Sequence, residues 1–252
     1  MLITAVIITH NEERNILRCL NSVHDVVDEV VVVDSLSTDN TEAICRKFGV
    51  RFVKQQWLGY SEQKNFANSL VSNDWILSID ADEELSDELR ISVFDLKTRD
   101  FSDDNVFSMN RLTSYCGHWI RHCGWYPDRK IRIWNRKVGK WQGAIHETIG
   151  FTKTIQENVL NGDLMHYSFE TAQGYENQQY KFAKMRGEEY YKKGKKHAAF
   201  YMIVSPVFAF IQHYFFQLGF LDGVDGFHIC RIAAKATKLK YRTLKELTDK
   251  KL

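Results

Sequence analysis

A short apolar run, Trp75–Ile79, is followed at once by two carboxylates, Asp80 and Asp82. Side chains alternate along an extended chain, so residues two apart point to the same side. Unpaired carboxylates repel each other, and hard oxygen ligands suit Mg²⁺ or Mn²⁺, which often join a carboxylate to a substrate phosphate. The pair therefore predicts a metal site, whereas the same pattern met alone would also fit a solvated acidic turn.

Polar clusters follow two other apolar runs in the first hundred residues. Thr9, Asn11 and Glu12 come at the end of the first run, and Asp34 and Ser35 at the end of the second. In sheets of parallel strands, ligands bind beyond the carboxyl ends of the strands, near a topological switch point. We therefore expect these clusters and the aspartate pair to lie on one rim and to form one site.

The first hundred residues alternate between strand and helix patterns. The expected strands are Leu2–Thr9, Glu29–Asp34, Arg51–Lys54 and Trp75–Ile79. The expected helices are capped by Asn11, by Ser37 or Asp39, by Ser61 and by Ser86, and Gly49 ends the second of them. This order predicts an α/β fold with a mostly parallel central sheet and helices on both faces.

The pattern changes after about Phe101. Mixed or antiparallel strands are expected at Val106–Asn110, Lys130–Trp134 and Phe151–Ile155, among loops rich in Trp, Tyr and His. After Glu170 a long, basic, tyrosine-rich stretch predicts helix to about Lys196.

Composition places the chain among globular proteins. Its 252 residues are 44% hydrophobic and 26% charged, enough for one large domain or one domain with an appendage. The five cysteines are odd in number and scattered, and the N-terminus has no secretory pattern, so we expect reduced thiols in a cytoplasmic protein.

Charge is unevenly distributed. From Glu176 to the end there are 15 Lys or Arg against 7 Asp or Glu, although the net charge of the chain is only +2. This basic, aromatic end suggests an anionic surface as partner, with a membrane as the first candidate. Nucleic acid is not expected, because no recognised binding motif is present.

The longest apolar stretch, Ala198–Phe220, lies in this basic part. As one helix it would span ~34 Å, enough to cross a bilayer. Ser205 and Pro206, however, predict a helix start that splits the stretch, and its polar residues disfavour a full span. We expect an amphipathic segment at the inner face of the cell membrane; a helix buried against the core or against a second subunit of a homodimer is the alternative.

Three ordered motifs carry a family resemblance: Ala5–Glu12, Val33–Thr41 and Ile79–Glu83 resemble those of family 2 glycosyltransferases with the GT-A (Rossmann-like) fold. The later segments Arg132–Trp134, Trp141–Gly143, Ile145–Glu147 and Gly219–Gly223 are similar to those of bacterial lipopolysaccharide-core β-glucosyltransferases. The resemblance implies a glycosyltransferase domain over residues 1–170, with a nucleotide-binding half at 1–100 and an acceptor half at 101–170. Residues 171–252 would form a helical, possibly membrane-associating extension.

The implied activity is inverting, metal-dependent transfer of a hexose, glucose from UDP-glucose, to a lipopolysaccharide-core, lipid-linked or other surface glycan acceptor. The resemblance assigns the nucleotide to Thr9, Asn11, Glu12, Asp34, Ser35, Lys64 and Asp80. It assigns a divalent metal, Mg²⁺ or Mn²⁺, to Asp82, Asp80 and His166. Many relatives have an Asp where this chain has Ser35, which leaves the nucleobase open. Structural alternatives are a helix-dipole acid for Asp34, a surface lysine for Lys64 and a core histidine for His166.

An inverting transfer also needs a base for the acceptor hydroxyl. Glu147 is the first candidate for this base, and His146 beside it could orient it or contact phosphate. Asp128 is the second candidate. The structural alternatives are a salt-bridged surface acid for Glu147 and a turn residue after proline for Asp128. Arg129 and Arg132 could bind phosphate or an anionic acceptor. The tryptophans of this half could stack on a sugar or simply pack; they are Trp119, Trp125, Trp134 and Trp141.

Other functional classes fit less well. Haloacid-dehalogenase phosphatases need Thr or Val where Glu84 stands, and a nucleotidyltransferase needs a glycine-rich loop that Thr9–Glu12 lacks. The Cys116, His118, His122 and Cys123 spacing matches no common zinc site. A non-catalytic carbohydrate- or membrane-binding protein that keeps the fold remains the alternative from another class.

Overall fold

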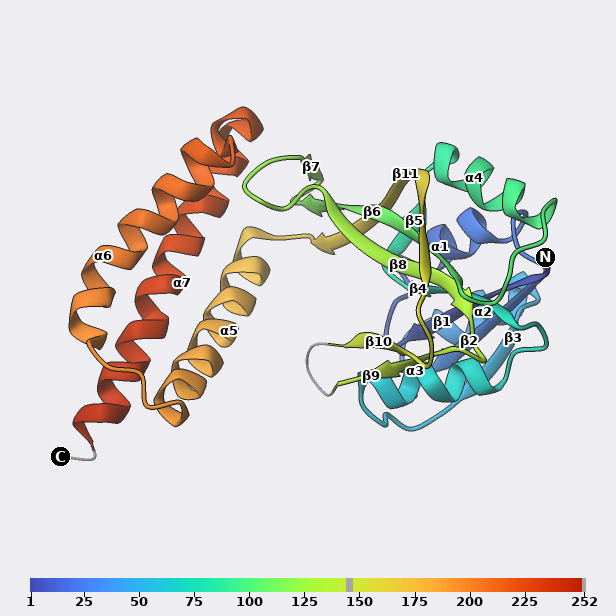
Figure 1. Cartoon of the computed structure of the whole chain (residues 1–252), viewed down its shortest axis with the longest axis horizontal. Helices are drawn as coiled ribbons and strands as arrows, with labels where there is room; N and C mark the ends of the chain where they lie inside the picture. Colours follow the sequence, from blue (N-terminus) through green and yellow to red (C-terminus); the bar gives the residue numbers. More distant parts are fainter. Residues whose placement is uncertain (144–146, 251–252) are drawn as a thin grey trace. The chain divides into compact units, whose positions relative to one another are not determined.

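The computed structural model describes residues 1–143 and 147–250 of the chain and divides into two compact units (Figure 1). The first comprises residues 1–111 and 128–166, and the second comprises residues 112–127 and the chain from 167 onward. The division falls within two long strands, β6 and β11. The predicted domain boundary at residue 170, between a glycosyltransferase domain and a helical extension, stays a prediction.

Four parallel strands begin the sheet of the first unit: β1 (Ile3–Thr9), β2 (Glu29–Asp34), β3 (Arg51–Lys54) and β4 (Trp75–Asp80). They lie in the order β3-β2-β1-β4. Thr9 is in register with Asp34, and Ile8 with Asp80, so the three strands that carry the polar clusters end together. The predicted common rim is therefore present.

The sheet continues with antiparallel strands and is mixed rather than parallel throughout. The order beyond β4 is β8 (Asp128–Asn135), β6 (Asn105–Tyr115), β11 (Gln156–Phe169) and β5 (Glu83–Leu85). Strands β9 (Gly139–Gln142) and β10 (Thr148–Phe151) form a separate antiparallel pair. The expected strand at Phe151–Ile155 is wrong, since most of that range lies between β10 and β11.

Helices cover both faces of the sheet, as expected. Alternate residues of β1 divide between two cores. Helices α1 (Ile16–Val23), α2 (Thr41–Phe48) and α4 (Asp87–Lys97) pack with Ile3, Ala5 and Ile7, while α3 (Tyr60–Ser69) packs on the opposite face, with Val6.

Helix starts were harder to predict than helix ends. Ser86 caps α4 by accepting from the N–H of Leu89, and Gly49 ends α2 with φ of 82°, both as predicted. The other expected caps are wrong, because α1, α2 and α3 begin after Asn15, Asn40 and Gly59, none of which makes a side-chain capping bond. Asn11, Ser37 and Asp39 instead bond within the loops after β1 and β2, where Asp39, for example, accepts from the N–H of Thr41. Ser61 lies inside α3 and donates to the Gly143 carbonyl.

The second unit is mainly helical. It contains β7 (His118–Ile120), α5 (Ala172–Lys192), α6 (Ala198–Ile211), the π-helical turn Gln212–Phe216, the 3₁₀ turn Gly219–Asp222 and α7 (Gly223–Asp249). Figure 1 shows α5, α6 and α7 side by side. Tyr115, Tyr175 and Cys230 are among the residues of its small core.

Pro206 does not begin a new helix, which corrects the expected split. It lies inside α6, which runs unbroken from Ala198 to Ile211. A proline inside a helix removes one backbone hydrogen bond, and α6 nevertheless continues through Pro206 as it packs along α7. Among the described residues, α6 buries no side chain, and large apolar residues such as Phe208 (62% exposed) and Phe216 (77%) face outward.

The cysteine and histidine pattern of this unit builds no zinc site within the described ranges. The Sγ atoms of Cys123 and Cys230 are 3.6 Å apart, both buried. His122 instead contacts the Asp222 carboxylate, which also accepts the backbone N–H of His122 at 2.8 Å. Asp222 therefore ties the loop after β7 to the start of α7.

Candidate active site

A cavity of about 1390 Å³ opens at the rim of the first unit, where β1, β2 and β4 end. Its walls include the residues expected to bind nucleotide and metal at Thr9, Glu12, Ser35, Lys64, Asp80, Asp82 and His166. Glu147, Arg129 and Arg132 from the expected acceptor half also line it. The structure thus brings most of the predicted site residues to one place.

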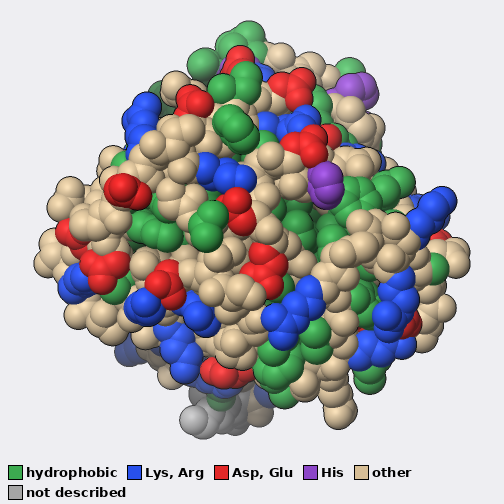
Figure 2. All heavy atoms as spheres, turned by 90° about the vertical axis from the view of Figure 1, so that its right-hand side faces the viewer, with side chains coloured by type: hydrophobic (Ala, Val, Ile, Leu, Met, Phe, Trp, Pro, Cys, Tyr) green, Lys and Arg blue, Asp and Glu red, His purple; other side chains and the backbone are tan. Residues whose placement is uncertain are grey.

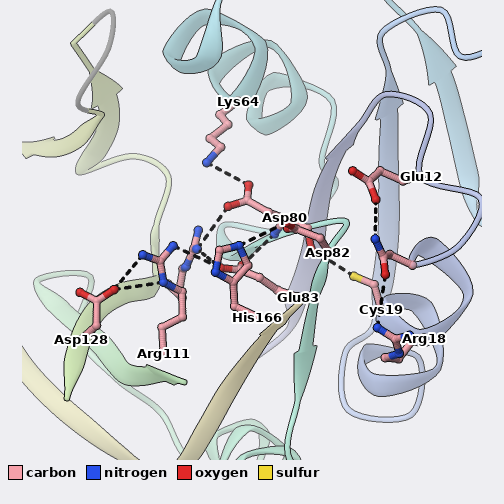
Figure 3. Close-up of polar contacts among 12 residues, drawn as sticks. Glu12, Arg18, Cys19, Lys64, Asp80, Asp82, Glu83, Arg111, Asp128 and His166 are labelled. Atoms are coloured by element: carbon pink, nitrogen blue, oxygen red, sulfur yellow. Dashed lines mark hydrogen bonds and ion pairs between the residues drawn. The ribbon is translucent and has the colours of Figure 1, made fainter. Parts of the chain in front are cut away.

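Asp80 lies between two cations. Lys64 reaches from α3 to one carboxylate oxygen at 3.0 Å, and Arg132 approaches the other at 3.3 Å (Figure 3). Burial alone would raise the pKa of Asp80, but the two positive charges outweigh it and hold this pKa well below its ordinary value. Asp80 is therefore a carboxylate that organises two cations at the cavity wall.

Glu83 also belongs to the site, although the sequence indicated it only as the last residue of the Ile79–Glu83 motif. Its side chain is fully buried, and its carboxylate accepts the Asp80 backbone N–H at 2.9 Å and an Arg132 N–H at 2.5 Å. Burial raises its pKa, partly opposed by the charge of Arg132. The signal that could have found Glu83 is a third acid following the aspartate pair on the strand that leaves the rim.

Asp82 and His166 form the second polar pair. His166 Nε2 lies 3.2 Å from Asp82 Oδ2, and both side chains line the cavity. In the part of the chain that the structure describes, no group of three or more His, Cys, Asp or Glu side chains could hold a metal. One carboxylate and one imidazole nevertheless suit an ion such as Mg²⁺ or Mn²⁺ that keeps waters and substrate phosphates as its other ligands, so the residues present fit the predicted metal.

The nucleotide side of the cavity contains Thr9, Glu12 and Ser35. Thr9 is buried, and its hydroxyl has no hydrogen-bond partner among the described residues. Ser35 accepts from Nε2 of the buried Gln63 at 3.1 Å. Gln63 therefore fixes the Ser35 side chain, at the position where the family resemblance leads one to expect an Asp.

Asn11 and Asp34 are not among the described residues that line the cavity. Asp34 is fully buried and accepts from the backbone N–H and the hydroxyl of Ser37. Asn11, with φ of 56°, accepts from the backbone N–H of Thr38. Both side chains shape the loops after β1 and β2, and a nucleotide role for them stays a prediction.

The two base candidates have different surroundings. Glu147 lines the cavity just before β10, whereas Asp128, at the start of β8, is held by Arg111 at 2.7 Å and by Lys130 at 2.9 Å. Burial opposes ionisation of Asp128, but the Lys130 hydrogen bond and the charge of Arg111 lower its pKa. A carboxylate so neutralised accepts a proton poorly, which favours Glu147. His146 lies outside the described residues.

The pair β9–β10 is attached to α3. The Asn65 side chain donates to the Trp141 carbonyl at 2.9 Å and accepts the Trp141 N–H at 3.0 Å. The Lys64 ammonium also lies 4.6 Å from the centre of the Trp141 ring. Trp134 and Trp141 pack edge to face in one core, but Trp141 also lines the cavity, so sugar stacking by Trp141 stays a prediction.

Sequence reasoning also missed Arg111, Trp57 and Tyr60 in the cavity wall. Arg111 sits on β6 opposite Asp128 in the strand register, a pairing that only the antiparallel sheet creates. Trp57 and Tyr60 are exposed and contact each other edge to face, with ring centres 4.8 Å apart. Two neighbouring exposed aromatics beside a polar cluster were the available signal.

Comparison with known proteins agrees with this architecture. The model of the family described as glycosyl transferase family 2 matches residues 4–160. An uncharacterised glycosyltransferase of Rickettsia typhi is 34% identical, covering 98% of this chain and 88% of the relative. The lipopolysaccharide core biosynthesis glycosyltransferase LpsC of Rhizobium meliloti is 28% identical, covering 89% and 85%. The S. aureus TarS fragment 1-349 with UDP-GlcNAc superposes with a TM-score of 0.46 at 15% identity, covering 100% and 92%.

The fold and the family match define a glycosyltransferase with the GT-A fold. The chain belongs to glycosyl transferase family 2, which confirms the resemblance inferred from its three motifs. Its similarity to the lipopolysaccharide-core enzyme LpsC extends over most of both chains.

Proposed function

We propose that the protein is an inverting, metal-dependent hexosyltransferase that moves glucose from UDP-glucose to a hydroxyl of a lipopolysaccharide-core, lipid-linked or other surface glycan. The observation that carries the proposal is the cavity in which Lys64, Arg132 and the Asp80–Asp82 pair converge at the rim of the sheet. That arrangement suits a diphosphate leaving group, whose negative charge grows as the glycosidic bond breaks.

Asp82 and His166 would hold the divalent metal, which supplies Lewis-acid stabilisation of the departing diphosphate. Lys64 and Arg132 add fixed positive charge, and Asp80 with Glu83 keeps both cations in place before the substrate arrives. Thr9, Glu12 and Ser35 would contact the nucleoside, with Ser35 oriented by Gln63. The donor would thus be bound along the ends of β1, β2 and β4.

Glu147 would act as the base. In a single displacement the acceptor oxygen attacks the anomeric carbon from the face opposite the leaving group, so the sugar changes anomeric configuration. Glu147 takes the proton of the attacking hydroxyl, and UDP leaves with the electron pair of the broken bond. It lines the cavity and is not part of the Arg111–Asp128–Lys130 group of salt bridges, which supports this assignment.

The site of action would be the inner face of the cell membrane. Within the described chain, one helical segment, Ala198–Phe216, is long and apolar enough to cross a membrane by length and composition, and none of it is buried. The basic run Lys192–Lys196 directly precedes this segment in the sequence, and the segment carries exposed aromatic side chains, a combination typical of segments that lie on anionic bilayers. The name of the relative LpsC supports an envelope glycan as acceptor.

A thermal-shift screen of nucleotide sugars, with and without Mn²⁺, tests the donor. We expect UDP-glucose to raise the melting temperature only when the metal is present, because a ligand that binds the folded state stabilises it. Hydrolysis of the same donor, measured by release of UDP, separates an enzyme from a non-catalytic binding protein. Stabilisation by UDP-glucose without any turnover in the presence of glycan acceptors would favour the binding protein.

A further inference from the structure

Three further cations line the cavity from neighbouring strands: Arg111 on β6, and Arg129 and Lys130 on β8. They are separate from Lys64 and Arg132, the cations that contact Asp80. In Figure 3 Arg111 lies to one side of Asp80, while Lys64 approaches Asp80 from α3. The cavity therefore has a second basic region besides the one assigned to the diphosphate.

One carboxylate serves two of these cations. Asp128 contacts Arg111 through Oδ2 at 2.7 Å and Lys130 through Oδ1 at 2.9 Å. Arg111 also lies 3.9 Å from Glu83, but Glu83 is engaged more closely by Arg132, at 2.5 Å. With both Asp128 oxygens occupied, this carboxylate has little left for a third cation.

Arg129 is that third cation. Its side chain is exposed and lines the cavity, and no described residue makes a hydrogen bond or ion pair with it. A guanidinium presents several N–H donors in a fixed plane, which matches the two oxygens of a carboxylate or phosphate. Side chains alternate along β8, so Arg129 points to the other side of the strand from Asp128 and Lys130, and its planar donor set is separate from their salt bridges.

We propose that Arg129 forms a subsite for an anionic group on the acceptor. This inference rests on the proposed function and deepens it, because it names the acceptor class as a glycan carrying a carboxylate or phosphate near the reacting hydroxyl. The donor diphosphate is not the ligand of this subsite, since Asp80, Lys64 and Arg132 already form a region for it. Glu147 lines the same cavity, so an acceptor held at Arg129 shares the cavity with the candidate base.

The test uses the full chain, loaded with UDP and Mn²⁺ so that the diphosphate region is filled. Binding of three monosaccharide probes is followed by saturation-transfer NMR: glucose, galacturonic acid for the carboxylate and glucose 6-phosphate for the phosphate. We expect one or both anionic probes to bind at least about tenfold more tightly than glucose, and more weakly as salt is raised. The two anionic probes decide between carboxylate and phosphate.

Variants localise the effect. Arg129→Ala should remove the preference for the anionic probe. Arg129→Lys should keep part of it, because the positive charge remains but the planar pair of N–H donors of the guanidinium is lost. Lys140→Ala is the matched control, as an exposed cation on β9 that does not line the cavity. Thermal melts of all three variants establish that they are folded.

Two results would overturn the subsite: anionic probes that bind no better than glucose, or an Arg129→Ala variant that behaves like Lys140→Ala. Displacement of the anionic probe by added UDP would also refute it, because the probe would then occupy the diphosphate region. Failure of UDP itself to bind contradicts the proposed donor, and retained binding of the anionic probe at Arg129 would then support the subsite alone. The two proposals can therefore fail separately.

Discussion

Glu83 accepts the backbone N–H of Asp80 at 2.9 Å with one carboxylate oxygen and contacts Arg132 at 2.5 Å with the other. Arg132 in turn reaches the Asp80 side chain at 3.3 Å. The three residues therefore contact one another in a ring. The fully buried Glu83 holds both the backbone of Asp80 and the Arg132 guanidinium that faces the Asp80 side chain.

Replacing Glu83 tests this ring of contacts. Glu83→Gln should lower the free energy of unfolding by about 3 kcal/mol, because the buried Arg132 charge loses its closest partner. Urea denaturation measures the change, and Asp74→Asn, which breaks a surface pair with Lys137, is the control expected to cost less than about 1 kcal/mol. Equal losses in the two variants would mean that Arg132 does not depend on Glu83.

The metal assignment predicts a specific loss at Asp82. Asp82→Asn should abolish the extra thermal stabilisation that Mn²⁺ gives to the UDP complex and reduce transfer by about 100-fold or more, since the ion contributes several kcal/mol to the departing diphosphate. Asp103→Asn is the matched control, because Asp103 is an exposed acid paired with Lys153. An Asp82→Asn enzyme with undiminished Mn²⁺ dependence would place the ion elsewhere.

The two base candidates should behave differently. Glu147→Gln is expected to lower kcat by about 100-fold or more, as loss of a general base does, and to leave donor binding largely intact. Asp128→Asn releases Arg111 and Lys130 from their shared carboxylate, so it should alter the acceptor KM more than kcat. Steady-state kinetics with varied acceptor separates the two. The reverse pattern would identify Asp128 as the base.

Acid stability should depend on Glu29 at the start of β2. Burial opposes its ionisation, but hydrogen bonds from Ser72 and Thr4 lower its pKa below the ordinary value. An acid with a lowered folded-state pKa stabilises the protein above the unfolded pKa of about 4.3, and this contribution is lost as pH falls through the folded value. Glu29→Gln should therefore cost about 2 kcal/mol at pH 7, and the difference from wild type should shrink in acid. Chemical denaturation across the acidic range measures this, and a difference that stays constant with pH would contradict it.

Membrane binding should depend on the exposed face of α6. Phe208→Glu is expected to reduce flotation with phosphatidylglycerol-containing vesicles by about tenfold, because an exposed aromatic that would insert into the bilayer is exchanged for a charge. Phe94→Glu on α4 is the control, since Phe94 is also an exposed phenylalanine but lies in the first unit. Unchanged flotation together with a lower oligomeric mass would indicate that a second copy covers this face instead.

Local patterns predicted the parallel half of the sheet well. β2 has the expected bounds, because a buried parallel strand is a continuous apolar run with clear polar ends. β3 also has the expected bounds, although it is an edge strand without buried residues. Asp34 and Pro206 show the limit of such patterns. Whether Asp34 turns to a cavity or to Ser37 depends on loop geometry, and whether Pro206 ends a helix depends on what the surrounding residues support.

The missing parts of the site come from pairing between distant segments. Arg111 meets Asp128 only because β6 and β8 run antiparallel in one register, and Glu83 meets Arg132 across 49 positions of sequence. The mixed charges at the surface give no further guide, since acidic and basic side chains are interspersed over the face in Figure 2. The Arg111–Asp128 and Glu83–Arg132 contacts join residues far apart in the sequence, so no local sequence pattern predicts them.

The double hydrogen bond between Asn65 and Trp141 has a mechanical consequence. It links α3, which carries Lys64 of the proposed donor region, to β9, which is paired with the strand that follows Glu147. A substitution on α3 made to alter donor preference would therefore also displace the acceptor wall. Engineering of one substrate in this enzyme should carry a side effect on the other.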